Sequence, residues 1–75
     1  QENIFNELVM TGLRTIYGVS IAKLTDIQPL SEAFLSKSNQ FIAEGLLELN
    51  NGILTTTENG RLQADYLASE LFVLS

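Results

Sequence analysis

The sequence predicts a small α+β domain, mainly helical, with about four helices and a sheet of two or three strands. Three observations within residues 41–60 predict it. Gly45 follows a helical pattern, and a residue without a Cβ atom can take the left-handed conformation that ends a helix. Asn51-Gly52 is a strong signal for a two-residue hairpin turn, because both positions need a positive φ. Thr57 suits the N-cap of a last helix. This order of elements is typical of a winged helix.

The first helix is predicted over residues 4–14, with Asn3 as its N-cap. We expect Gly12 to let another backbone approach closely, because it has no Cβ atom. Val19 is expected to add a short strand to the hairpin. The apolar residues of the helix have the spacing of one buried face: Phe5, Leu8, Val9, Gly12 and Leu13.

Two more helices are predicted before the hairpin, at residues 21–26 and 32–44. Ser20 and Ser31 are their expected N-caps, since a serine hydroxyl accepts from first-turn amides. Pro29 separates them, because the residue before a proline is disfavoured in the helical region. In a DNA-binding winged helix the third helix enters the major groove. Its predicted buried face holds Phe34, Ser38, Phe41 and Ile42, with Leu35 at the margin.

Counting outward from the turn, Leu49 should face Leu54 and Leu47 should face Thr56. The last helix is predicted over residues 58–73, with apolar residues on more than one side. Such a helix usually packs against more than one neighbour. One side holds Ala64, Leu67, Ala68 and Leu71, and a second side holds Leu62, Tyr66 and Val73, with Phe72 left over.

The composition allows one small domain and excludes several functions. The 75 residues carry a net charge of −5 with four Lys and Arg in total, and they include no His and no Cys. Nucleic-acid binding needs cations that neutralise phosphates, and an anionic membrane surface has the same requirement. Catalytic triads, cysteine nucleophiles, zinc clusters and thiolate-held iron–sulfur clusters need residues that are missing here. We therefore predict no catalytic residue, no metal ligand, no nucleic-acid partner and no membrane partner.

Hydrophobic residues make up 45% of the chain and charged residues 17%. This apolar content and the absence of a starting Met lead us to expect that residues 1–75 are an accessory domain of a longer protein. No signal peptide is recognised, and the longest apolar run, residues 71–74, is too short to span a bilayer. A cytoplasmic location is expected.

Arg14 is the one candidate for ligand contact, and two interpretations of it stay open. It lies at the end of the first helix, where its charge would complement the exposed carbonyls. Alternatively, its guanidinium group binds a carboxylate of a ligand or of a neighbouring domain. Lys37 and Arg61 are interpreted as surface cations, and Tyr17 and Tyr66 as residues at the edge of the core.

Several motifs in series resemble the C-terminal domain of oxygen-independent coproporphyrinogen III oxidases and their relatives. They are ELVMTGLR at residues 7–14, GVS at 18–20, FIAEGLLE at 41–48, and the NNG turn followed by Thr57 and Gly60-Arg61. Thr56 stands where the family usually has Leu, so we expect that side of the hairpin to be less buried. The residues that match the family pattern as structural positions are Met10, Gly12, Leu13, Gly45, Leu46, Thr57 and Gly60.

The resemblance implies a radical S-adenosylmethionine parent, with a [4Fe–4S] cluster held by three cysteines in an upstream barrel domain. Oxidase members decarboxylate two propionates of coproporphyrinogen III, whereas a sister branch resembles haem chaperones. This domain would bind no cofactor itself. It would pack on the barrel and help to close the cleft for the porphyrin substrate or haem. Arg14 matches the arginine of the family's G-L-R motif.

The fold class by itself also leaves two different functions open. One is a winged helix that binds nucleic acid, and the other is a winged helix that contacts proteins in a different complex. Fold alone is a weak argument for either function, because one fold carries many unrelated functions.

Overall fold

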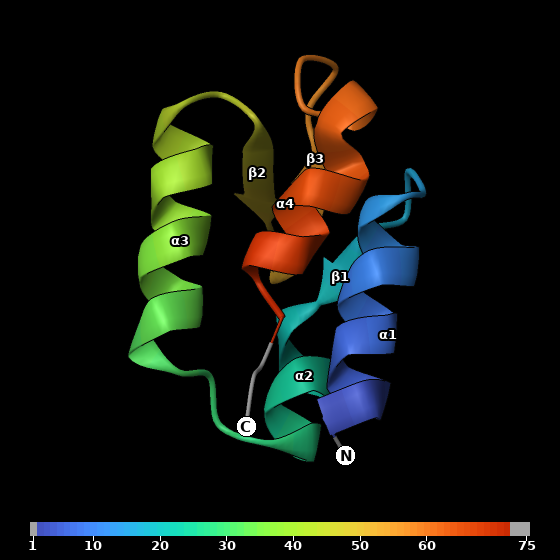
Figure 1. The fold of residues 1–75 in the computed structure, drawn as a ribbon, viewed down its shortest axis with the longest axis vertical. Helices are drawn as coiled ribbons and strands as arrows, with labels where there is room; N and C mark the ends of the chain where they lie inside the picture. Colours follow the sequence, from blue (N-terminus) through green and yellow to red (C-terminus); the bar gives the residue numbers. More distant parts are fainter. Residues whose placement is uncertain (1, 73–75) are drawn as a thin grey trace.

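The computed structural model describes residues 2–72, and over this range it has the predicted α+β class (Figure 1). Within residues 2–72, four α-helices, one short 3₁₀ helix and three strands follow one another. They are α1 (Glu2–Leu13), β1 (Val19–Ser20), α2 (Ile21–Ile27), α3 (Glu32–Ala43), β2 (Leu47–Asn50), β3 (Ile53–Thr56), η1 (Arg61–Gln63) and α4 (Ala64–Glu70).

The three strands form one antiparallel sheet in the order β1-β3-β2. The short strand expected at Val19 is confirmed, and Val19 pairs with Leu54 of the central strand. Asn51 and Gly52 have φ angles of 53° and 78°, so the turn has the two positive φ values that its sequence predicts. Both predicted register pairs are present: Leu49 with Leu54, and Leu47 with Thr56.

The predicted helix caps are confirmed at α2 and α3. The hydroxyls of Ser20 and Ser31 accept from backbone N–H groups three residues on, at 3.3 and 3.0 Å. At the end of α3, Gly45 has a φ of 78° and its N–H donates to the carbonyl of Ile42. The next N–H, that of Leu46, reaches back to Phe41 at 2.9 Å. These two hydrogen bonds give partners to carbonyls that have no partner within the helix.

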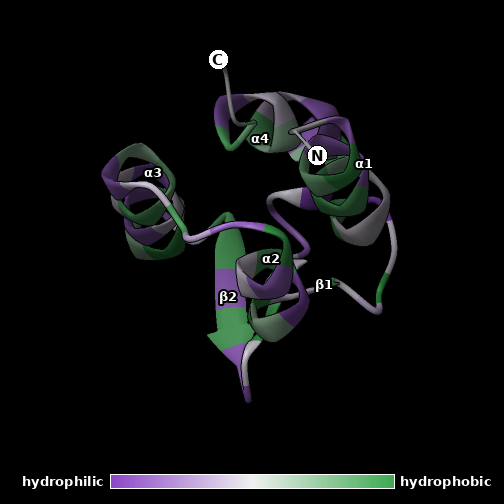
Figure 2. Cartoon of the chain, turned by 90° about the horizontal axis from the view of Figure 1, so that it is seen from below, coloured by the Kyte–Doolittle hydropathy of each residue, from purple (hydrophilic) through white to green (hydrophobic). Residues whose placement is uncertain are grey.

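The core lies between the sheet and the helices. α1 and α4 pack side by side, and α3 lies on the other side of the interior next to β2 (Figures 1 and 2). Phe5 and Phe34 meet edge to face in this core, with ring centroids 5.8 Å apart. The predicted stripe of α4 is buried in full: Ala64, Leu67, Ala68 and Leu71.

Two predicted helix starts are wrong. α1 already includes Glu2, so Asn3 lies inside the helix and is not its N-cap. Thr57 does not cap the last helix, because the chain first makes a turn at Gly60 and then the 3₁₀ helix η1. The hydroxyl of Thr57 accepts from the N–H of Gly60, which closes that turn. The predicted contact of Val73 lies outside the described residues.

The burial of Thr56 also differs from the expectation. Its side chain is buried, with 6% of the residue exposed, and its hydroxyl donates to the carbonyl of Leu13 at 3.4 Å. A polar side chain is tolerated inside when it has such a partner.

The second side of the last helical segment is exposed, since Leu62 is 98% and Tyr66 54% accessible. No helix within residues 2–72 has the length and apolar character that crossing a membrane requires.

Candidate functional site

Arg14 follows the last residue of α1 and reaches across to the first turn of α4. Its Nε donates to Oδ1 of Asp65 at 2.8 Å, and its Nη2 donates to Oδ2 at 3.2 Å. The two bonds make a bidentate pair between residues 51 positions apart in the sequence. The carboxylate that Arg14 binds in this structure therefore belongs to the same domain. Sequence reasoning misses Asp65, because no local pattern connects it with Arg14.

The pair lies at the surface, with 54% of the Arg14 side chain and 67% of the Asp65 side chain exposed. The hydrogen bond from Arg14 lowers the pKa of Asp65, and the hydrogen bond to Asp65 raises the pKa of Arg14. Water screens such a pair, so it adds little to folding stability. A guanidinium group has five N–H donors and this pair uses two. The remaining donors of Arg14 can therefore bind a second carboxylate without breaking the first pair.

An open pocket of about 450 Å³ lies beside this pair, over η1 and the start of α4. Arg14 and Arg61 both line it, together with Leu62, Asp65 and Tyr66. These two arginines are half of the four cations in a chain of net charge −5. Such a pocket combines apolar contact with groups that bind carboxylates.

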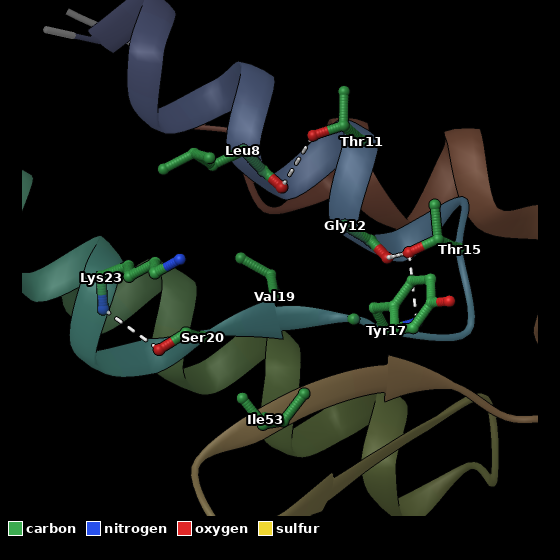
Figure 3. Close-up of a pocket in the computed structure, with 10 residues that line it drawn as sticks. Leu8, Thr11, Gly12, Thr15, Tyr17, Val19, Ser20, Lys23 and Ile53 are labelled. Atoms are coloured by element: carbon green, nitrogen blue, oxygen red, sulfur yellow. Dashed lines mark hydrogen bonds between the residues drawn. The ribbon is translucent and has the colours of Figure 1, made fainter.

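A second open pocket, of about 440 Å³, lies between α1, the loop after it and the start of α2 (Figure 3). Gly12 lies on its wall, and a Cβ atom there would be 2.8 Å from the backbone carbonyl oxygen of Gly18, so the predicted close approach of another backbone is confirmed. The hydroxyls of Thr11 and Thr15 already donate to backbone carbonyls, as Figure 3 shows for both residues. The hydroxyl of Ser20 accepts the N–H of Lys23. Because these hydroxyls have partners, we assign no ligand to this pocket.

Comparison with protein-family models matches residues 1–63 to the HemN C-terminal domain. The chain belongs to this family. This family comprises the C-terminal domains of HemN-type coproporphyrinogen oxidases and related radical SAM proteins, which is the family that the sequence motifs indicate. Comparison with curated proteins and with solved structures gave no match. The family match ends at the last residue of η1, so it includes Arg14 and stops before Asp65.

In this HemN C-terminal domain, four of the family-matching positions meet at one place. The hydroxyl of Thr57 donates to the carbonyl of Gly45 at 2.6 Å, and its N–H donates to the carbonyl of Leu46 at 3.0 Å. Gly60 lies against the same carbonyl of Leu46, where a Cβ atom would be only 2.0 Å away. These residues therefore connect the end of α3 to the segment that follows the hairpin.

The remaining family-matching positions lie on α1. Leu13 is buried in the core, Gly12 faces the strand β1, and Met10 is half-buried. The backbone carbonyl of Met10 accepts the N–H of Arg14 at 3.3 Å, which holds Arg14 in the turn after the helix. The C-terminal end of α1 thus supplies both a core contact and the support for Arg14.

No group of three His, Cys, Asp or Glu side chains that could hold a metal ion is present among residues 2–72. The full sequence has no Cys and no His. Iron–sulfur clusters of the radical SAM type need thiolate ligands. The residues of this HemN C-terminal domain therefore do not fit such a cluster.

Proposed function

We propose that this chain is the accessory C-terminal domain of an oxygen-independent coproporphyrinogen III oxidase that acts in the cytoplasm. The domain packs on the catalytic barrel of its own polypeptide and helps to close the substrate cleft. The family match over residues 1–63 is the observation that carries this proposal. The parent protein would bind S-adenosylmethionine and a [4Fe–4S] cluster in the barrel, and this domain would contribute packing surface and no reactive group.

Arg14 is the residue that we propose for contact with a ligand or with the barrel. It matches the arginine of the family's G-L-R motif, and its guanidinium has unused donors beside an open pocket that Leu62 and Tyr66 also line. Coproporphyrinogen III is an apolar macrocycle that carries propionate groups. A surface with Leu62 and Tyr66 next to an arginine suits a molecule of that kind, or a carboxylate on the barrel.

The element order of the domain supports the winged-helix interpretation, but the charges do not favour nucleic-acid binding. Lys37 is the cation of α3, the helix that would enter a groove, and it is paired with Glu70 at 3.1 Å. Few cations are therefore free to neutralise phosphates. A role in protein contact fits the exposed apolar residues better.

The test compares the full-length parent protein with a shortened version that ends just before residue 1 of the present sequence and therefore lacks this domain. We expect both to bind the cluster and S-adenosylmethionine, and we expect the shortened protein to lose most of its anaerobic turnover of coproporphyrinogen III. Equal turnover in both proteins would refute the proposed role. Haem binding without any turnover in the full-length protein would place the parent in the chaperone branch.

Arg14 is tested by comparing Arg14→Ala with Asp65→Asn in the full-length protein. Both variants break the pair, but only the first removes the guanidinium group. If Arg14 binds a carboxylate of the porphyrin, Arg14→Ala weakens porphyrin binding in an equilibrium titration and Asp65→Asn does not. Equal binding by both variants and the unchanged protein would refute a contact between Arg14 and the porphyrin.

A further inference from the structure

The pair of Arg14 and Asp65 joins two segments that carry most of the exposed large apolar side chains. The described residues expose seven large apolar side chains, and four of them lie within three positions of one member of this pair. The other three lie apart, one each on α1, α3 and β2. We call the following residues the ion-pair patch: Arg14, Ile16, Tyr17, Leu62, Asp65 and Tyr66.

The fold brings the two segments of the ion-pair patch to one end of the molecule. Ile16 and Tyr17 belong to the loop after α1 and are 72% and 80% exposed, while Leu62 of η1 is 98% exposed. The bond between Arg14 and Asp65 ties that loop to the start of α4. Figure 1 shows the loop and the start of α4 at the same end of the domain. A leucine with so large an exposed fraction does not pack in the core of its own domain.

The charges of the patch indicate what would cover it. Arg14 retains unused donors, and Arg61 lines the same pocket, within a domain whose net charge is −5. Two of the four cations of the chain therefore lie at this end. Its complement is an apolar surface with carboxylates at the rim, since complementary charges fix the register of an interface. Arginine and tyrosine are also the residues that interfaces favour.

We propose that the ion-pair patch is the surface through which this domain docks on the preceding catalytic domain of its own polypeptide. Leu62 enters an apolar socket on that domain, and carboxylates at the edge of the socket bind Arg14 and Arg61. This inference rests on the proposed function, because membership in a C-terminal domain family identifies the occupant. It adds the face, the central residue and the chemistry of the opposite surface.

The experiment compares hydroxyl-radical oxidation of side chains in the full-length protein and in the 75-residue chain, whose fold is checked by circular dichroism. We expect Leu62 and Tyr66, which both line the pocket beside Arg14, to be oxidised about fivefold or more slowly in the full-length protein, as in the dry centre of an interface. Leu35 and Leu49, which are 46% and 50% exposed outside the patch, should react at similar rates in both proteins.

A pair of matched variants tests the same face in the full-length protein. Leu62→Asp should raise the rate at which a protease releases the domain by about tenfold, because a charge buried in an apolar socket weakens an interface strongly. Leu35→Asp is the control, as an exposed leucine on α3. Equal release from both variants would overturn the role of Leu62. Circular dichroism of Leu62→Asp in the 75-residue chain separates lost docking from lost folding.

The outcomes distinguish this inference from the proposed function. Protection of Leu35 or Leu49 with an unprotected Leu62 means docking through another face, which overturns the inference and leaves the proposed function intact. Equal oxidation of all these residues in both proteins means that the domain does not dock, which overturns both. Protection of Leu62 in the 75-residue chain that grows with concentration means a contact between copies, which also overturns the inference.

Discussion

The hydroxyl of Thr57 donates a 2.6 Å hydrogen bond to the carbonyl of Gly45, twelve residues earlier. The same oxygen accepts the N–H of Gly60 at 3.1 Å. One side chain thus connects the end of α3, the exit of the hairpin and the turn that leads to η1. Thr57 stabilises a junction between segments, and this role differs from the helix cap that its sequence position suggests.

Replacement of Thr57 by valine should lower the free energy of unfolding by about 1–2 kcal/mol, because two hydrogen bonds lose their side-chain partner. Thr57→Ser retains the hydroxyl and is the matched control. Urea unfolding followed by circular dichroism measures both variants. Equal stability of Thr57→Val and Thr57→Ser would show that the hydroxyl does not hold the junction.

Gly60 and Gly45 should respond differently to alanine. At Gly60 a Cβ atom would lie 2.0 Å from the carbonyl oxygen of Leu46, so the backbone must shift, at a cost of about 3 kcal/mol or more. At Gly45 there is open space but φ is 78°, and a left-handed alanine costs about 1–2 kcal/mol. Urea unfolding of Gly60→Ala and Gly45→Ala gives the comparison. A larger loss at Gly45 would contradict the packing described for Gly60.

Two leucines five positions apart test which side of the last segment is buried. Leu67 is fully buried, and Leu67→Ala should cost about 2–5 kcal/mol. A domain of this size has a total stability of roughly 4–11 kcal/mol, so this variant is expected to lose a large share of it. Leu62→Ala should change stability by less than about 0.5 kcal/mol. Thermal unfolding checks both, and similar losses would mean that α4 is rotated from the described position.

The pKa of Asp65 should depend on Arg14. The hydrogen bond from Arg14 lowers this pKa in the folded protein, so the contribution of the pair to stability is present above the pKa of the unfolded carboxyl. It is lost as the pH falls through the lower, folded-state value. In a carboxyl NMR titration, Arg14→Ala should raise the pKa of Asp65 toward its ordinary value. Lys37→Ala is the control, and an unchanged pKa in Arg14→Ala would contradict the pair.

The local parts of the fold follow from short stretches of sequence. Ser20 and Ser31 as caps, the turn at Asn51-Gly52 and the end of α3 at Gly45 each depend on interactions within a few residues. The register of the hairpin follows from the turn, because a two-residue turn sets which residues face each other. Errors occur where a distant contact competes with a local preference, as at Thr57, whose hydroxyl bonds to Gly45.

The candidate site can be predicted from the sequence only in part. Arg14 stands out because it is one of four cations and belongs to a family motif, but its partner Asp65 is 51 positions away. The buried state of Thr56 has the same origin, since its hydroxyl bonds to Leu13 on α1. Neither partner can be inferred from periodicity, which describes one element at a time.

The sequence by itself determined the α+β class, the caps of α2 and α3, the turn at Asn51-Gly52, the family and the lack of thiol and imidazole chemistry. Each of these depends on residue identity or on neighbours along the chain. The tertiary structure decided the late start of α4, the pair of Arg14 with Asp65 and the pocket beside it that Leu62 and Tyr66 line. These features depend on how α1 packs against α4, and only the packed chain brings such distant side chains within bonding distance.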